Sequence, residues 1–134
     1  MSVIIDTSVW IDGFNPKTKN QQKETLQRLI NEDHPIYLCP IIYQEILQGI
    51  RDDNTYEKVK EILQQYRILD IDIMIVSDFA ASLYRDLRKK GITIRKSVDC
   101  LIASYAIMAN IPLLHNDSDF THIARGSSLI IYQE

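Results

Sequence analysis

The stretch Val3-Ile4-Ile5-Asp6 decides the fold. Three consecutive β-branched apolar residues without polar alternation are typical of a strand buried on both faces. Asp6 then comes at the carboxyl end of that strand, and Thr7 and Ser8 are suited to cap a helix that follows at once. Ligands of an open α/β sheet bind at this edge. Asp6 is therefore either a site residue or only an acid at a helix start, and the stretch alone leaves both readings open.

Length and composition favour one globular domain over residues 1–134. Apolar residues make up 46% of the chain and charged residues 25%, which is ordinary for such a domain. No stretch approaches the roughly 18 apolar residues of a membrane span, and we expect no signal peptide because the chain runs straight into a strand. Cys39 and Cys100 lie in apolar runs, so we expect buried thiols and a cytoplasmic location. The net charge of −3 does not exclude a nucleic-acid partner, since metal ions in an acidic pocket can supply positive charge.

Apolar segments that read as strands alternate with amphipathic segments that read as helices. Ser77 and Asp78 are expected near the start of one helix, Gly91 at its end, and Ser97 as the cap of the next. This alternation predicts an α/β fold with a mostly parallel sheet and helices on both faces. The expected strands are 3–5, 36–39, 68–71, 112–115 and 128–132, and the expected helices are 8–14, 21–33, 41–50, 55–65, 76–90 and 97–109.

Further acids fall where this fold brings them to the edge that carries Asp6. Glu45 lies about one turn into the helix that leaves the second strand, although a solvent-facing glutamate would fit the same pattern. Asp99 lies in the first turn of a helix that must end at the opposite edge to feed the fourth strand, although it could serve only the helix dipole. Asp117 follows the fourth strand as Asp6 follows the first, and Asp119, two residues later, could only cap a turn.

Carboxylates gathered in this way repel one another unless cations lie between them. Oxygen-only ligands suit Mg²⁺ or Mn²⁺. His34, His115 and His122 are scattered and offer no zinc spacing. The sequence also lacks a glycine-rich phosphate loop and a Gly-x-Ser-x-Gly turn, so it gives no support to phosphate-loop nucleotide binding or serine hydrolysis.

A basic run precedes Asp99 in the sequence. It reads either as a solvated helix end with dipole-favoured cations or as a phosphate-binding flank beside a metal pocket. The RNA-binding candidates within it are Arg85, Arg88, Arg95 and Lys96.

Four separated stretches resemble PIN-domain ribonucleases, and specifically the VapC toxins of type II toxin–antitoxin pairs. They are IIDTSVWID, PIIYQEILQG, SVDCLIASYAI and LLHNDSDFTHIA, in this order. The resemblance covers essentially the whole chain. It implies a three-layer PIN-like fold with five parallel strands in the order 3-2-1-4-5. It also implies metal-binding acids at Asp6, Glu45, Asp99 and Asp117, with a less certain role for Asp119.

The resemblance further implies hydrolysis of RNA by metal-activated water, with Mg²⁺ or Mn²⁺ as cofactor. Asp6 and Asp99 are the expected direct ligands, and Ser8 could donate a hydrogen bond to one of them or only cap its helix. The expected partners are an RNA substrate, a second copy of the chain, and an antitoxin on apolar surface near Trp10 and Phe14, although core packing is the stronger expectation for Trp10.

Other functions remain open on the sequence. A haloacid dehalogenase would place a second aspartate where this chain has Ser8, and a receiver domain would place a lysine after its last strand, where only Gln133 and Glu134 remain. A PIN-like module that acts through protein or RNA binding, with little catalysis, is the main alternative to an enzyme.

Overall fold

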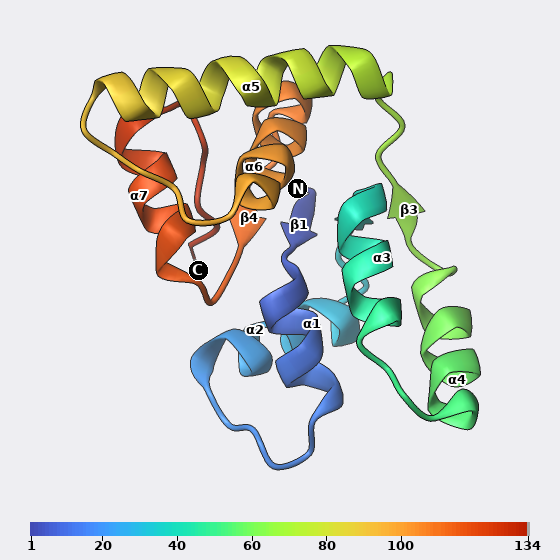
Figure 1. Cartoon of the computed structure of the whole chain (residues 1–134). Helices are drawn as coiled ribbons and strands as arrows, with labels where there is room; N and C mark the ends of the chain where they lie inside the picture. Colours follow the sequence, from blue (N-terminus) through green and yellow to red (C-terminus); the bar gives the residue numbers. More distant parts are fainter. Residues whose placement is uncertain (134) are drawn as a thin grey trace.

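A computed structural model describes residues 1–133, so Glu134, the last residue of the expected domain, lies outside the described residues. Two helices follow each of the first three strands, and one helix follows the fourth (Figure 1). The strands are β1 (Val3–Ile5), β2 (Ile36–Leu38), β3 (Arg67–Ile68) and β4 (Leu113–Leu114). The helices are α1 (Thr7–Phe14), α2 (Gln21–Asn31), α3 (Pro40–Gln48), α4 (Asp53–Leu63), α5 (Ile73–Lys89), α6 (Ser97–Ala109) and α7 (Ser118–Gly126).

The parallel sheet has the order β3-β2-β1-β4, so the first strand lies in its interior. Ile4 pairs with Tyr37 of β2 on one side and with Leu113 of β4 on the other. All three side chains of β1 are fully buried. Successive strand residues point to opposite faces, so both faces of this strand are covered, as the apolar run VII predicts.

The predicted fifth strand, 128–132, is wrong for the described residues, because only a single bridge forms there. Ile131 pairs with Leu113 in parallel, and the amide of Tyr132 donates to the Leu113 carbonyl at 2.9 Å. The Leu113 amide donates in turn to the Ile130 carbonyl at 2.9 Å. The segment therefore lies beside β4 as expected, but its pairing stops at this bridge and the sheet keeps four strands.

Four of the helices are capped at their amino ends by an aspartate side chain. The caps are Asp6 for α1, Asp52 for α4, Asp72 for α5 and Asp117 for α7. These caps shift three predicted starts: α1 begins at Thr7 and not at Ser8, α4 at Asp53 and not at Thr55, and α5 at Ile73 and not at Val76. Ser97 is the first residue of α6 and not its cap, because Lys96 precedes the helix without making a side-chain capping bond.

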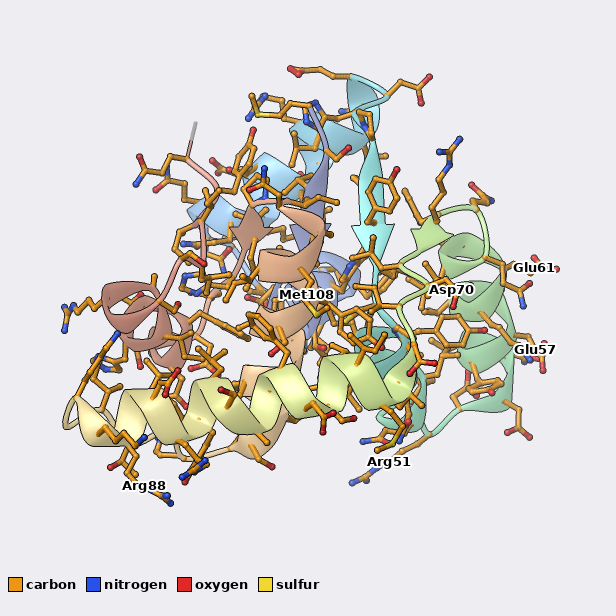
Figure 2. All side chains as sticks on the ribbon, turned by 90° about the horizontal axis from the view of Figure 1, so that it is seen from above. Arg51, Glu57, Glu61, Asp70, Arg88 and Met108 are labelled. Atoms are coloured by element: carbon orange, nitrogen blue, oxygen red, sulfur yellow. The ribbon has the colours of Figure 1, made fainter. Side chains whose placement is uncertain are left out.

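Helix α5 is the longest helix and packs mainly against α6 (Figure 1). In Figure 2 it crosses the front of the molecule, with Arg88 pointing outward near its far end. Gly91 ends it as predicted, at a φ of 80° that other residues rarely adopt. The Ile92 amide then donates to the Leu87 carbonyl at 2.8 Å, which closes the last turn.

Two expectations about burial are confirmed. Cys39 and Cys100 are buried free thiols, and burial raises the pKa of the Cys39 thiol to about 12 and that of Cys100 to about 11. Trp10 belongs to the core and is 2% exposed. Among residues 1–133, no helix is both long enough and apolar enough to cross a membrane.

Candidate active site

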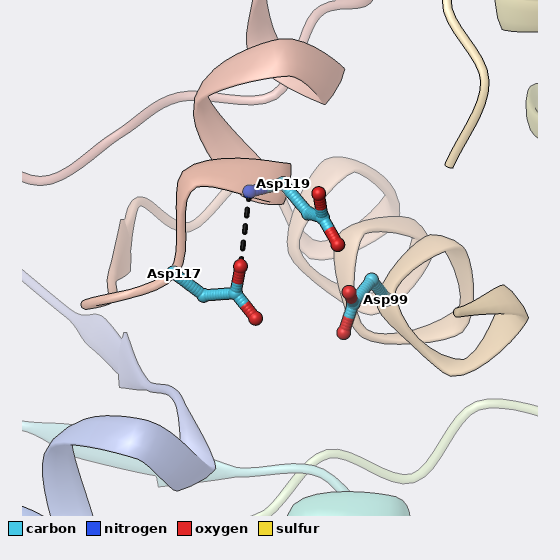
Figure 3. A group of neighbouring side chains, drawn as sticks. All are labelled: Asp99, Asp117 and Asp119. Carbon is cyan, nitrogen blue, oxygen red and sulfur yellow. Dashed lines mark hydrogen bonds between the residues drawn. The ribbon is translucent and has the colours of Figure 1, made fainter. Parts of the chain in front are cut away.

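Three aspartates from α6 and α7 come together beyond the carboxyl end of β4. One oxygen from each of Asp99, Asp117 and Asp119 lies within 4.8 Å of the others. Asp99 comes from the first turn of α6, Asp117 caps α7, and Asp119 lies in the first turn of α7. Figure 3 shows the three side chains side by side, with the carboxylate of Asp117 bonded to the backbone nitrogen of Asp119.

Asp99 is the most electrostatically strained member of this aspartate triad. Its side chain is 5% exposed, and its Oδ2 atom accepts no hydrogen bond from any described residue. Burial raises the pKa of the Asp99 carboxyl to about 7, against the lowering effect of Lys96, while Asp117, Asp6 and Asp119 raise it further. A buried carboxylate oxygen without a hydrogen bond is costly unless a cation approaches it.

Asp117 and Asp119 are better neutralised. Asp117 accepts from the Asp119 amide at 3.0 Å and from Lys96 Nζ at 3.2 Å. Its partial burial acts to raise the pKa of the carboxyl, but these two donors outweigh burial and lower it. Asp119 is buried, and Arg95 Nε lies 3.3 Å from its Oδ2 atom. The capping role that the sequence left open for Asp119 belongs to Asp117, so Asp119 is free to contribute to the cluster.

Asp6 lies next to the triad but is not one of the three. It is 4% exposed, and burial raises the pKa of its carboxyl in spite of the hydrogen bonds from Ser8. Ser8 donates to Asp6 Oδ2 through both its amide, at 3.1 Å, and its hydroxyl, at 2.6 Å. Asp6 also raises the pKa of Asp99, which shows that the two carboxylates act on one another.

Ser8 also connects the ends of β1 and β4. Its hydroxyl oxygen accepts from the Asn116 amide at 3.1 Å, while the Asn116 side chain donates to Asp12 at 3.2 Å. Both roles considered for Ser8 are therefore present: it hydrogen-bonds a candidate ligand, and its amide is the donor to the Asp6 cap. Sequence reasoning missed Asn116 in this role, because the contact spans the chain and no local pattern indicates it.

Glu45 lies farther out on α3. Thr7 Oγ1 donates to Glu45 Oε1 at 2.8 Å, which ties the first turn of α1 to α3. Glu45 is half-buried and contributes to raising the pKa of Asp6. It is thus close to Asp6, as the sequence predicts, but outside the aspartate triad. Thr7, expected as a helix cap, holds Glu45 instead.

The basic run divides into two parts. Arg95 and Lys96 reach Asp119 and Asp117 and so neutralise the site itself. Arg85 and Arg88 are exposed on α5, where Arg88 lies over the ring of Tyr84 at 5.9 Å. The proposed RNA-binding flank stays a prediction, and the two α5 arginines are the members of it that no described carboxylate neutralises.

His115 does not form an acid–base pair at this site. Its Nδ1 atom accepts from the Asp117 amide at 3.1 Å, which assigns the remaining ring proton to Nε2. Burial lowers the pKa of His115, so the ring is neutral near pH 7, and it packs against Phe120 at 5.4 Å between centroids.

The donor set fits a hard divalent cation. The triad offers only carboxylate oxygens, and Asp99 contributes a buried oxygen that lacks a hydrogen bond. Mg²⁺ and Mn²⁺ prefer such ligands, with water and substrate phosphate completing their coordination. The arrangement can therefore hold an ion beside a phosphodiester.

Comparison with known proteins shows the family and the fold. A family model described as PIN domain matches residues 3–126. Ribonuclease VapC11 of Mycobacterium tuberculosis is 36% identical over 127 residues, which is 95% of each chain. VapBC2 of Rickettsia felis, solved bound to a DNA fragment from its promoter, superposes with a TM-score of 0.76 at 22% identity over 98% of both chains. VapBC-1 of nontypeable Haemophilus influenzae superposes with a TM-score of 0.74 at 18% identity, covering 98% of this chain and 97% of the other.

Proposed function

Since the chain belongs to the PIN-domain family, we propose that it is a metal-dependent endoribonuclease and the toxin of a toxin–antitoxin pair. The observation that carries the proposal is the aspartate triad with its unbonded Asp99 oxygen. Support for RNA as the substrate comes from the relative named a ribonuclease, which matches over 95% of the chain. Support for the antitoxin comes from the VapBC names of the proteins that share the fold.

In this proposal Asp99, Asp117 and Asp119 hold the ion directly. Asp6 adds negative charge beside Asp99 and is a further ligand, while Glu45, held by Thr7, orients water at the edge of the site. When bound, Mg²⁺ or Mn²⁺ supplies electrophilic activation of the phosphate and an activated water. Ser8 keeps the Asp6 carboxylate oriented through a 2.6 Å bond, and the neutral His115 holds the Asp117 loop through its ring nitrogen.

Cleavage of RNA by the purified protein, with and without chelator, tests the proposal. We expect cleavage with Mg²⁺ or Mn²⁺ and none in excess EDTA. Asp99→Asn should abolish cleavage while the protein stays folded, whereas Asp78→Asn, which makes the same change at an exposed site on α5, should cleave normally. Activity that persists in EDTA would refute metal dependence. A protein that binds RNA in Mg²⁺ without cutting it would favour the binding-module alternative.

For the antitoxin we propose an apolar groove between the end of α1, α3 and α4. The groove has a volume of about 370 Å³ and is lined by Ile11, Phe14, Ile46, Ile50 and Val59, among others. Phe14 is 37% exposed and is the accessible member of the Trp10–Phe14 pair. Phe14→Asp should release the antitoxin on co-purification, and an undisturbed complex would contradict this placement.

Dimerisation and cytoplasmic location stay proposals. Support for a homodimer comes from the amino-terminal turns of α5, where Ile73, Met74, Ile75 and Phe79 are exposed, because exposed apolar clusters commonly mark contact surfaces. Light scattering on the wild type and on Met74→Glu would test this surface, and a dimer that survives the substitution would exclude Met74 from the interface.

A further inference from the structure

Lys96 lies between two of the three triad carboxylates. Its ammonium nitrogen is 3.2 Å from Asp117 Oδ2 and 3.9 Å from Asp99 Oδ2. Its own side chain is 55% exposed, whereas the Asp99 side chain is 5% exposed. A charge on a flexible, half-exposed stem therefore neutralises carboxylates that are themselves fixed and largely buried.

The ammonium approaches oxygens that a divalent ion would need. Asp99 Oδ2 has no hydrogen bond from the described residues, and its closest cation is Lys96 at 3.9 Å. A doubly charged ion held by the triad would face the ammonium across a few ångströms and would repel it. The lysine stem has four rotatable bonds and the side chain is 55% exposed, so the ammonium can move away into solvent at little cost.

Arg95 differs in this respect. It reaches Asp119 alone, at 3.3 Å from Oδ2, with a side chain that is 70% exposed. It therefore contacts one acid of the cluster, whereas Lys96 lies between Asp99 and Asp117. Of the two basic residues at the site, Lys96 is the one positioned to compete with an ion for shared ligands.

We propose that Lys96 is an internal counter-ion that holds Asp99 and Asp117 together in the metal-free protein and that a divalent ion displaces. This inference rests on the metal site of the proposed function and goes beyond it. Lys96 stabilises the fold before the metal arrives and weakens metal binding by the same competition. The residue thus sets the concentration of Mg²⁺ or Mn²⁺ at which the site fills.

Titration of Mn²⁺ into the full chain, without RNA, tests the proposal by calorimetry. Lys96→Met keeps the aliphatic stem and removes the charge, so it should bind Mn²⁺ about threefold to tenfold more tightly than the wild type, as expected for the loss of one or two half-exposed ion pairs. Lys96→Arg keeps the charge and should bind Mn²⁺ nearly as the wild type does. Lys89→Met, which removes a charge from the exposed end of α5, controls for net charge.

Thermal melting supplies the second measurement. In EDTA, Lys96→Met should melt below the wild type, because the acids lose their counter-ion, and saturating Mn²⁺ should remove most of that difference, because the displaced lysine no longer contributes. Lys96→Gln repeats both measurements if the methionine variant does not fold.

Equal or weaker Mn²⁺ binding by the neutral variants, or an equal gain in Lys89→Met, would overturn the role of Lys96. Failure to detect Mn²⁺ binding in any protein would also overturn it. A protein that binds Mn²⁺ as described but leaves RNA intact would refute the proposed function alone, so the two failures are distinguishable.

Discussion

Asp99→Asn should stabilise the metal-free protein in a way that depends on pH. The pKa of the Asp99 carboxyl stands at about 7 and not at 3.8. Each pKa unit corresponds to about 1.4 kcal/mol, so the ionised carboxylate costs the fold about 4 kcal/mol. Above pH 7 the group is ionised in the folded and unfolded states, and this cost is fully present. Near pH 4 the folded state keeps the proton and the cost disappears, so stability from this group falls as pH rises from about 4 to 7.

Asparagine keeps the shape of the side chain and removes the charge. Removing the buried charge should therefore raise the free energy of unfolding at pH 8 in EDTA by about 2 to 4 kcal/mol, and at pH 4 by almost nothing. The range extends below about 4 kcal/mol because the surroundings of an ionised Asp99 can relax and reduce its cost. Urea melts of the wild type, Asp99→Asn and the exposed control Asp78→Asn at both pH values measure this. Mg²⁺ should stabilise the wild type and not Asp99→Asn. A variant that is less stable than the wild type at pH 8, or a gain equal at both pH values, would refute the electrostatic reasoning.

Three further outcomes are expected. Ser8→Ala removes the bond to Asp6 and leaves the Asn116 amide without its acceptor, so urea melts should show a loss of about 1 to 3 kcal/mol, and an unchanged melt would contradict the bridging role. Charge reversal at Arg85 and Arg88 should weaken RNA binding and flatten its salt dependence, while unchanged gel-shift titrations would make that surface a solvated helix face. The RNA fragments should carry 5′-phosphate and 3′-hydroxyl ends by mass spectrometry, since no histidine pair supports attack by the 2′-hydroxyl, and cyclic-phosphate ends would overturn the metal route.

The central strand could be predicted because its signal is local, whereas three helix starts were misplaced by one to three residues. The run VII requires burial on both faces, and Asp6 follows it directly. The same logic failed at residues 128–132, where the apolar pattern is present but Ile131 alone forms a bridge, to Leu113 of β4. The β-propensity of a segment indicates that it can adopt an extended backbone. How many backbone hydrogen bonds it then makes depends on its fit to the neighbouring strand.

The site was predictable in its chemistry but not in its grouping. The order of strands and helices alone brings Asp99 and Asp117 to one edge of the sheet. Both lie at the amino end of a helix, and these helix ends meet at the carboxyl edge of the parallel strands. The pairing of Arg95 with Asp119 and of Lys96 with Asp117 joins residues 24 and 21 positions apart, and no nearby pattern encodes it. The sequence therefore indicated the charges that meet but not which cations neutralise them.

The placement of β1 between β2 and β4 has a consequence for biosynthesis. Synthesis delivers the first strand at the start and its second neighbour, Leu113–Leu114, only after most of the chain. Asp6 therefore leaves the ribosome long before Asp117 and Asp119 exist to join it. A chain that stalls or is cut before residue 113 has three of the four strands and carries Asp6, Glu45 and Asp99, but it lacks β4 and two of the three triad aspartates, so it cannot form the proposed metal site. The proposed nuclease activity, and the toxicity that would follow from it, therefore requires that translation has passed α7.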